Sequence, residues 1–316
     1  MPDLRKRFES SGEKGFILIV VLWAAVLLAL LAAGFAASVR AHVHATAGAL
    51  ELARAEAFAD GGVNLALMDL VTARQNPKFA SRFPAGGQPV GCTSASGTLL
   101  IVRIEDEAGK VNINLADERL LATFFAGLGA SSDQAAQYTD RVLDFRDGNN
   151  GTRPQGTERA GYVSGGSNIS PKNGAFDTVD ELSQVLGLAP ELTARAKPFA
   201  TVHSGLTGID GSVASSGLVA IFDAASLQSA AGGLTSSAAA FGDARLPARF
   251  STRSNQRAYT IHALARMASG VQYVTQAIVE FPVRSEQGYV LRQWRRGSVG
   301  DADRLEGINE GDVPPC

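Results

Sequence analysis

The chain has 316 residues, of which 45% are hydrophobic and 19% are charged, and its formal net charge is −2. This charge excludes the strongly basic composition of a general nucleic-acid binder, and the apolar content excludes a disordered chain. The length suits one or two domains with a sizeable core.

A short charged leader precedes one long apolar segment. Residues 16–39 contain no charged side chain, and Arg5, Lys6, Arg7 and Lys14 come before them. A helix of residues 16–39, rising about 1.5 Å per residue, is long enough to cross a bilayer core of about 30 Å. The Lys and Arg residues of the leader place it in the cytoplasm, so the rest of the chain is predicted to be translocated.

The glycine at the start of this segment is the feature that decides how it is processed. A secretory signal peptide is cleaved after its apolar region. In this chain Gly15 stands before it, directly followed by Phe16. We expect cleavage between Gly15 and Phe16, which leaves the apolar helix at the mature N-terminus and resembles the processing of prepilin-like proteins. An uncleaved signal anchor is the alternative.

The helix is predicted to continue beyond the membrane segment. The sequence as far as Val71 has no proline and repeats apolar residues at helical spacing, which indicates one helix over about residues 16–72. Gly61 and Gly62 are a candidate kink within it. Residues 76–97 are rich in Pro, Gly and Ser and are predicted to form a loop.

A strand, a block of short helices and three further strands follow. The strand is predicted over residues 98–105, from its alternating β-branched residues. Helices are predicted over residues 116–129, 132–146, 178–187, 189–197, 213–223 and 224–231. Strands are predicted over residues 249–267, 270–283 and 288–296.

This order predicts an α+β fold. We expect the long N-terminal helix to pack on an antiparallel sheet, with a large all-α domain inserted into it. The expected parts are a leader over 1–15, a transmembrane helix over 16–39, the helix continuation and start of the α/β domain over 40–111, the insertion over 112–248, the remaining strands over 249–297 and a tail over 298–316.

The two cysteines of the chain are Cys92 and Cys316. An even number of cysteines in an oxidising compartment permits a disulfide between them. Two independent thiols are the alternative. The sequence shows no Cys or His cluster with the spacing of a metal site.

An acidic loop follows the second predicted helix. When Asp147 is counted as the first position of a calcium-binding loop, Asn149 is third and Glu158 is twelfth, and all three are ligand positions. Thr152 replaces the glycine of the sixth position, and the residues alone favour an exposed Asn-Gly turn. Asp140 and Asp144 are further candidate ligands for Ca²⁺.

Residues 111–147 resemble a helix-hairpin-helix, with Gly127-Leu128-Gly129 as the hairpin. Residues 112–147 carry three arginines against six acids and no lysine, so protein binding is favoured over nucleic-acid binding. The histidines are isolated and no serine lies in a nucleophile elbow, so we expect no catalytic residue. The alternatives are a signal-anchored envelope enzyme and a membrane-anchored nucleic-acid-binding receptor with helix-hairpin-helix motifs.

Several sequence blocks, in this order, resemble the type II secretion minor pseudopilin K, the GspK family. The blocks are residues 15–23 at the prepilin junction, 106–114, 144–147 with 156–158 and Tyr162, 176–182 with 185–187, and 292–296 near the end. Residues 209–222 depart from the family pattern, because they have lost its asparagines.

The resemblance implies a subunit at the tip of the pseudopilus, which helps to initiate pseudopilus assembly and export across the outer membrane. Val20 stands at the fifth mature position, where most pilin-like subunits carry a glutamate that pairs with a neighbour. The implied partners are minor pseudopilins of the I and J types, the pseudopilus shaft and the prepilin peptidase, with no nucleic acid. The implied location is the bacterial inner membrane, single-pass, with most of the chain in the periplasm. Methylation of Phe16 and calcium binding at the acidic loop are also implied.

Overall fold

The computed structural model describes residues 13–76, 78–231, 246–282, 288–297 and 313–316. It divides into two compact units, residues 1–54 and 55–316. The residues expected to form an insertion therefore lie in the same unit as the sheet. The predicted leader and most of the predicted tail lie outside the described residues.

The first unit contains the N-terminal part of one long helix, α1 (Glu13–Gln75). Side chains from Phe16 to Leu50 are exposed, and the most apolar 18-residue window has a mean hydropathy of 3.1. An exposed apolar surface of this length is stable only against another apolar medium. The helix is long and apolar enough to cross a membrane, as expected for a single-pass anchor.

The second unit contains the rest of α1, which is buried along one face. Val63, Ala66 and Leu70 pack against the sheet. α1 runs as one uninterrupted helix through Gly61 and Gly62, the residues of the candidate kink. Gly62 has a packing role instead, since a β-carbon there would lie 2.7 Å from Leu100 Cδ1 and 3.0 Å from Ala263 Cβ.

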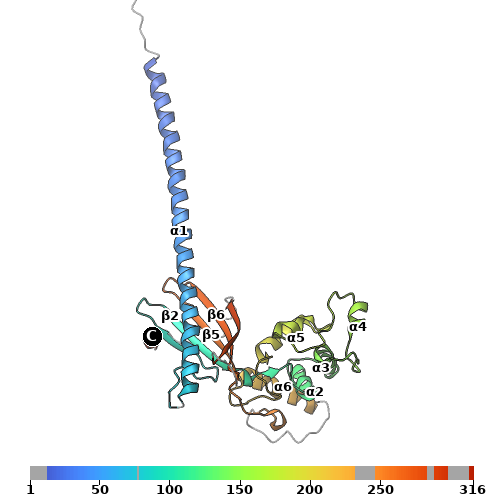
Figure 1. The fold of residues 1–316 in the computed structure, drawn as a ribbon. Coiled ribbons are helices and arrows are strands. Elements are labelled where there is room, and N and C mark those ends of the chain that lie inside the picture. The colour runs from blue at the N-terminus through green and yellow to red at the C-terminus, as the bar shows by residue number, and fades with distance from the viewer. Residues whose placement is uncertain (1–12, 77, 232–245, 283–287, 298–312) are drawn as a thin grey trace, which may run out of the picture. The chain divides into compact units, whose positions relative to one another are not determined.

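The sheet of this unit has five strands in the order β1-β2-β5-β6-β7, and every neighbouring pair is antiparallel (Figure 1). The strands are β1 (Val90–Thr93), β2 (Leu99–Asp106), β5 (Ala258–Arg266), β6 (Gln272–Glu280) and β7 (Val290–Gly297). The two faces differ because side chains alternate along a strand. Leu100, Val102 and Ile104 belong to the core with α1. On the opposite face, Leu99 and Ile101 belong to a small apolar cluster, and Arg103 and Glu105 form an ion pair that begins its polar part.

Short helices occupy the chain between β2 and β5, and Figure 1 shows α2 to α6 grouped together, apart from the strands. Their core is rich in aromatic rings, including Phe145 stacked on Phe176 with centroids 4.9 Å apart. The elements are η1 (Glu107–Gly109), β3 (Val111–Asn112), α2 (Glu118–Gly127), α3 (Ser132–Arg146), α4 (Arg159–Ser164), η2 (Val179–Gln184), α5 (Pro190–Ala196), η3 (Lys197–Phe199), β4 (Ala200–Thr201), α6 (Ser216–Ala231) and η4 (Ala248–Phe250). The long helix, the antiparallel sheet and the added helices confirm the predicted α+β class.

The end of the chain covers the outer edge of β1. The backbone N–H of Thr93 donates to the carbonyl of Pro314 at 2.9 Å, and the N–H of Cys316 donates to the carbonyl of Thr93 at 3.0 Å. Cys92 and Cys316 are joined by a disulfide. Backbone groups at a sheet edge attract other strands, so this segment protects one of the two edges.

Candidate functional site

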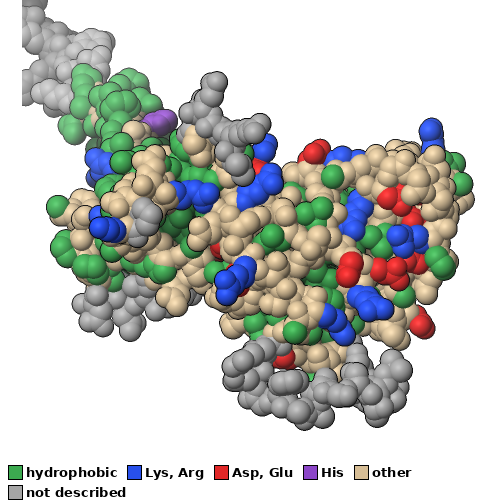
Figure 2. Space-filling view, turned by 60° about the horizontal axis from the view of Figure 1, so that its bottom comes forward, with side chains coloured by type: hydrophobic (Ala, Val, Ile, Leu, Met, Phe, Trp, Pro, Cys, Tyr) green, Lys and Arg blue, Asp and Glu red, His purple; other side chains and the backbone are tan. Residues whose placement is uncertain are grey.

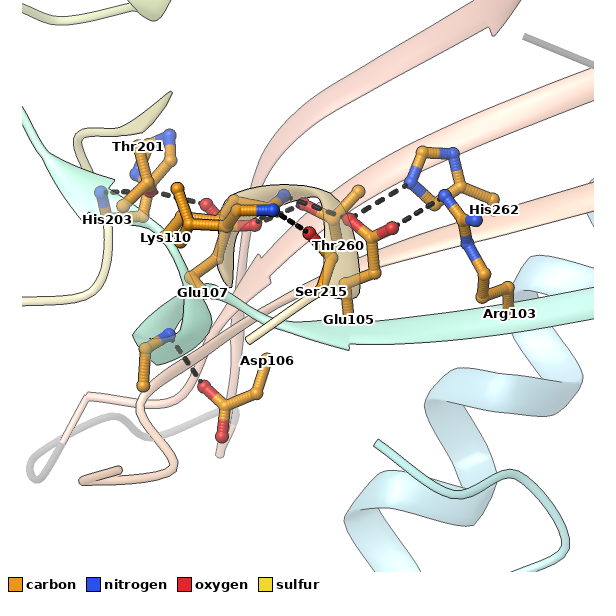
Figure 3. Close-up of polar contacts among 12 residues, drawn as sticks. Arg103, Glu105, Asp106, Glu107, Lys110, Thr201, His203, Ser215, Thr260 and His262 are labelled. Atoms are coloured by element: carbon orange, nitrogen blue, oxygen red, sulfur yellow. Dashed lines mark hydrogen bonds and ion pairs between the residues drawn. The ribbon is translucent and has the colours of Figure 1, made fainter. Parts of the chain in front are cut away.

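A buried carboxylate lies where the chain leaves β2 and enters the helical region, the residues between β2 and β5. Glu107 begins η1 directly after β2 and is 2% exposed. Its Oε1 accepts hydrogen bonds from Lys110 Nζ and from Thr260 Oγ1, both at 2.6 Å, and its Oε2 accepts one from Thr201 Oγ1 (Figure 3). One side chain therefore connects β2, β4 and β5. Burial alone would raise the pKa of Glu107, but the Lys110 charge and these donors lower it.

A second carboxylate extends this cluster along the polar face of the sheet. Glu105 lies between Lys110, whose Nζ is 3.1 Å from Oε2, and Arg103, whose Nη2 is 2.5 Å from Oε1 (Figure 3). His262 Nε2 is 3.7 Å from the same carboxylate. Burial raises the pKa of Glu105, but the cations outweigh it and hold the pKa well below its usual value. The pKa of Lys110 is raised, because two carboxylates outweigh its burial.

These residues line one side of a cleft of about 1110 Å³. The polar face of β2, β5, β6 and β7 forms one wall, and residues of η2, η3 and β4 form the other. Both walls belong to the second compact unit. The motif at residues 106–114 was quoted only as a family resemblance, and nothing in its local pattern predicted the cleft. The i,i+3 spacing of Glu107 and Lys110 is the one local signal that could have indicated their pairing.

The acidic loop brings together part of the predicted calcium ligand set. Asp144 on α3 is fully buried, and Glu158, which precedes α4, is 7% exposed. Burial raises the pKa of both carboxyls, and the charge of Asp144 raises that of Glu158 further. Asp147 adds negative charge to both.

Three oxygens of this pair have no hydrogen-bond partner of normal geometry: Asp144 Oδ1 and both carboxylate oxygens of Glu158. The cation nearest to Asp144 Oδ1 is Arg153, with Nε at 3.7 Å. Buried carboxylate oxygens without a hydrogen-bond partner are unfavourable, and a hard cation between Asp144 and Glu158 would bind them. Asp144 and Glu158 therefore fit one end of a calcium site.

The side chains of Asn149 and Asp140, two other predicted ligands, accept hydrogen bonds from backbone N–H groups of the loop. Asn149 Oδ1 accepts the N–H of Gly151 at 2.6 Å, and Asp140 Oδ2 accepts the N–H of Gln155 at 2.9 Å. Within the described ranges, no group of three or more His, Cys, Asp or Glu side chains is placed to hold one metal ion. A complete coordination shell would need backbone carbonyls or water as well.

The hairpin between α2 and α3 uses its glycines for packing. A β-carbon at Gly127 would lie 2.0 Å from the carbonyl oxygen of Ile221 on α6, and Gly129 has a φ of +95°. Glycine amides that bind phosphate need an open surface, which Gly127 does not have. Figure 2 shows acidic and basic side chains interspersed on the visible face, with no single basic patch there. The close approach of Ile221 shows that Gly127 packs against α6.

The predicted cleavage residues, Gly15 and Phe16, lie in the first turns of α1, and Phe16 is exposed. Residues 1–12 of the leader lie outside the described part of the chain.

Comparisons with known proteins relate the chain to a protein family and to solved structures. Residues 101–205 match the family described as "Type II secretion system (T2SS), protein K". The chain is also similar to a chain of the crystal structure of the GspK-GspI-GspJ complex from the type 2 secretion system of enterotoxigenic Escherichia coli. That match has a TM-score of 0.57 and 14% sequence identity, and it covers 80% of this chain and 99% of the other. No curated protein matches the chain.

Proposed function

We propose that this chain occupies the tip of the pseudopilus. The family match and the structural match support it as a type II secretion minor pseudopilin K. The observation that carries the proposal is the helical region between β2 and β5, attached to a sheet that packs on one long helix. The long helix offers a packing surface for subunits below. The helical region adds bulk that hinders a further subunit from stacking above.

The proposed partners are minor pseudopilins of the I and J types, which accompany GspK in the similar crystal structure. The full chain, purified in detergent, is expected to form a complex with them that survives size-exclusion chromatography. The major shaft subunit is the control, and it is expected to bind the tip complex only weakly. If the chain replaces the major subunit freely within filaments, it is a shaft protein and the tip assignment is wrong.

Processing at Gly15 belongs to the same proposal. A prepilin peptidase cuts between Gly15 and Phe16, and Phe16 is then N-methylated. The apolar helix anchors the mature chain in the inner membrane, with the second unit in the periplasm. Mass spectrometry of the mature N-terminus tests this step. An intact Met1, or a cut beyond the apolar segment, would contradict it.

A structural calcium ion completes the proposal. Asp144 and Glu158 would hold it, with Asp147 supplying further negative charge. The ion would neutralise the Glu158 carboxylate and the Asp144 oxygen that have no hydrogen-bond partner. The chain's own contribution is to fix α3 and the start of α4 on either side of the loop, and no catalysis is involved.

A further inference from the structure

The rim of the cleft carries carboxylates that are each shared by two cations. Glu280 at the end of β6 is 3% exposed. Arg257 Nη2 lies 2.5 Å from its Oε1, and Arg292 Nε lies 2.5 Å from its Oε2. Burial raises the pKa of Glu280, but the two guanidiniums outweigh burial and lower it, so the carboxylate stays ionised. Two positive charges therefore face one negative charge.

The same arrangement recurs on the opposite wall. Asp180 in η2 forms an ion pair with Lys197, whose Nζ lies 2.8 Å from its Oδ1. Its Oδ2 forms a second ion pair with Arg295 Nη2, which comes from β7 on the sheet wall. A hydrogen bond from Lys197 is the largest cause that lowers the pKa of Asp180. The side chain of Lys197 is 41% exposed and that of Arg295 is 47% exposed. In each set, Arg257 with Arg292 and Lys197 with Arg295, two cations share one carboxylate. Their charged groups are partly exposed to the cleft.

A buried polar atom without a partner also lines the cleft. His262 on β5 is 5% exposed, and its Nε2 has no hydrogen-bond partner. The carboxylate of Glu105 lies 3.7 Å from this nitrogen. His262 interacts with Glu105, which lowers the pKa of that carboxyl, and its ring also lines the cleft, where a polar group that enters can meet it.

The size and charge pattern of the cleft decide what would enter. Its volume of about 1110 Å³ is large enough to hold a short length of extended polypeptide. Glu105, Glu107 and Asp177 also line it, and they would repel a continuous polyphosphate backbone. The carboxylates of an extended acidic peptide sit on flexible side chains, so some can reach the rim cations while others turn to solvent, whereas the charge of a polyphosphate lies in its backbone. Arginine recognises such carboxylates through paired N–H donors.

We propose that this cleft binds an extended acidic segment of another protein, with its carboxylates at the Arg257/Arg292 and Lys197/Arg295 sets. The backbone polar groups of the segment would then face the polar side of β5 and β6, including His262. The proposal does not depend on the tip assignment, because its test uses no pseudopilin partner.

The test measures binding of a dye-labelled hexaglutamate peptide to the full chain in detergent by fluorescence anisotropy. Hexaglutamine and inorganic tripolyphosphate are competitors. The double variant Arg292→Gln/Arg295→Gln is expected to bind about tenfold more weakly, which is the size of a lost charge-assisted hydrogen bond. It should fold, since Glu280 keeps Arg257 and Asp180 keeps Lys197. Arg119→Gln, at an exposed arginine on α2 outside the cleft, is the matched control and should bind like the unaltered chain.

Three results would overturn the proposal: no binding of hexaglutamate to the unaltered chain, equal binding by the double variant, or tighter binding of tripolyphosphate than of the peptide. A photo-crosslinking form of the peptide gives a readout that needs no variant. Crosslinks are expected on β7, η2 or η3, and crosslinks confined to other surfaces would also reject the site.

Discussion

Thr260 Oγ1 on β5 donates a hydrogen bond at 2.6 Å to the carboxylate of Glu107, at the point where the chain leaves the sheet for its helical region. The two residues are separated by 153 positions in sequence. Thr201 on β4 donates to the other oxygen, so the carboxylate fixes the last strand of the helical region to the sheet as well.

The first prediction concerns this carboxylate. Glu107→Gln is expected to reduce the free energy of unfolding by about 3–5 kcal/mol, because it leaves a buried Lys110 with only Glu105 as a counter-charge. Chemical denaturation of the full chain in detergent, followed by near-ultraviolet circular dichroism, measures the change.

Glu118→Gln is the matched control for that substitution. Glu118 has a side chain that is 67% exposed, and it pairs with Arg153 at 3.4 Å. Its loss should change stability by less than about 1 kcal/mol, since exposed ion pairs contribute little. If Glu107→Gln and Glu118→Gln lower the free energy of unfolding equally, Glu107 does not join the sheet to the helical region.

The second prediction concerns pH. The pKa of Glu107 is lowered on folding, so the folded state binds fewer protons and its stabilisation is present above the ordinary value of 4.5. We expect the difference in unfolding free energy between the unaltered chain and Glu107→Gln to be constant at neutral pH. It should shrink as the pH falls below about 4.5. A difference that grows as the pH falls would contradict the assigned direction.

The third prediction compares two adjacent glycines of α1. Gly62→Ala is expected to destabilise the fold by about 1–3 kcal/mol, because its β-carbon would lie 2.7 Å from Leu100 Cδ1. Gly61→Ala meets nothing within 4 Å and should stabilise the helix by about 0.5–1 kcal/mol. Thermal unfolding of both variants measures the contrast. If both variants are stabilised, Gly62 does not pack closely on β2.

The glycine pair illustrates what the sequence could predict. The uncharged apolar length predicted the first half of α1, and apolar periodicity predicted its second half and α3, because each of these buries one regular face. Nothing local distinguished Gly61 from Gly62, since the difference depends on which of them faces β2. The strand predicted from residue 249 begins only at Ala258. The side chain of Asn255 accepts the N–H of Arg257 at 3.1 Å, and Asp210 accepts the N–H of Ser254 at 2.7 Å, so side chains replace strand pairing there.

The sequence indicated one candidate site and not the other, because only the acidic loop consists of residues that are close together along the chain. The acidic loop is local in sequence, so its spacing predicted Asp147, Asn149 and Glu158 as calcium ligands, with Asp140 and Asp144 as further candidates, and this ligand set stays a prediction. The Glu107 cluster joins residues far apart along the chain, and its partners Thr201 and Thr260 have no pattern of their own. β1 was missed because its four residues lie in a segment rich in Pro and Gly, where pairing with β2 determines the structure.

The fourth prediction concerns calcium. Burial raises the pKa of Glu158, so its charge opposes folding at neutral pH when no cation is bound. Glu158→Gln should therefore raise the melting temperature in a chelator and remove the further rise that calcium gives to the unaltered chain. Differential scanning calorimetry with calcium and with chelator measures both effects.

Asp133→Asn on the first turn of α3 is the control, because Asp133 is exposed and is not among the proposed ligands. It should keep the full response to calcium. An identical melting temperature of the unaltered chain in calcium and in chelator would reject the calcium site.

The position of the chain within a filament tests the tip assignment most directly. Pseudopili assembled with a chain that carries an epitope tag after Cys316 can be labelled with gold-conjugated antibody and imaged by electron microscopy. The tip assignment predicts label at one end of each filament and none along the shaft. Label distributed regularly along the shaft would contradict it.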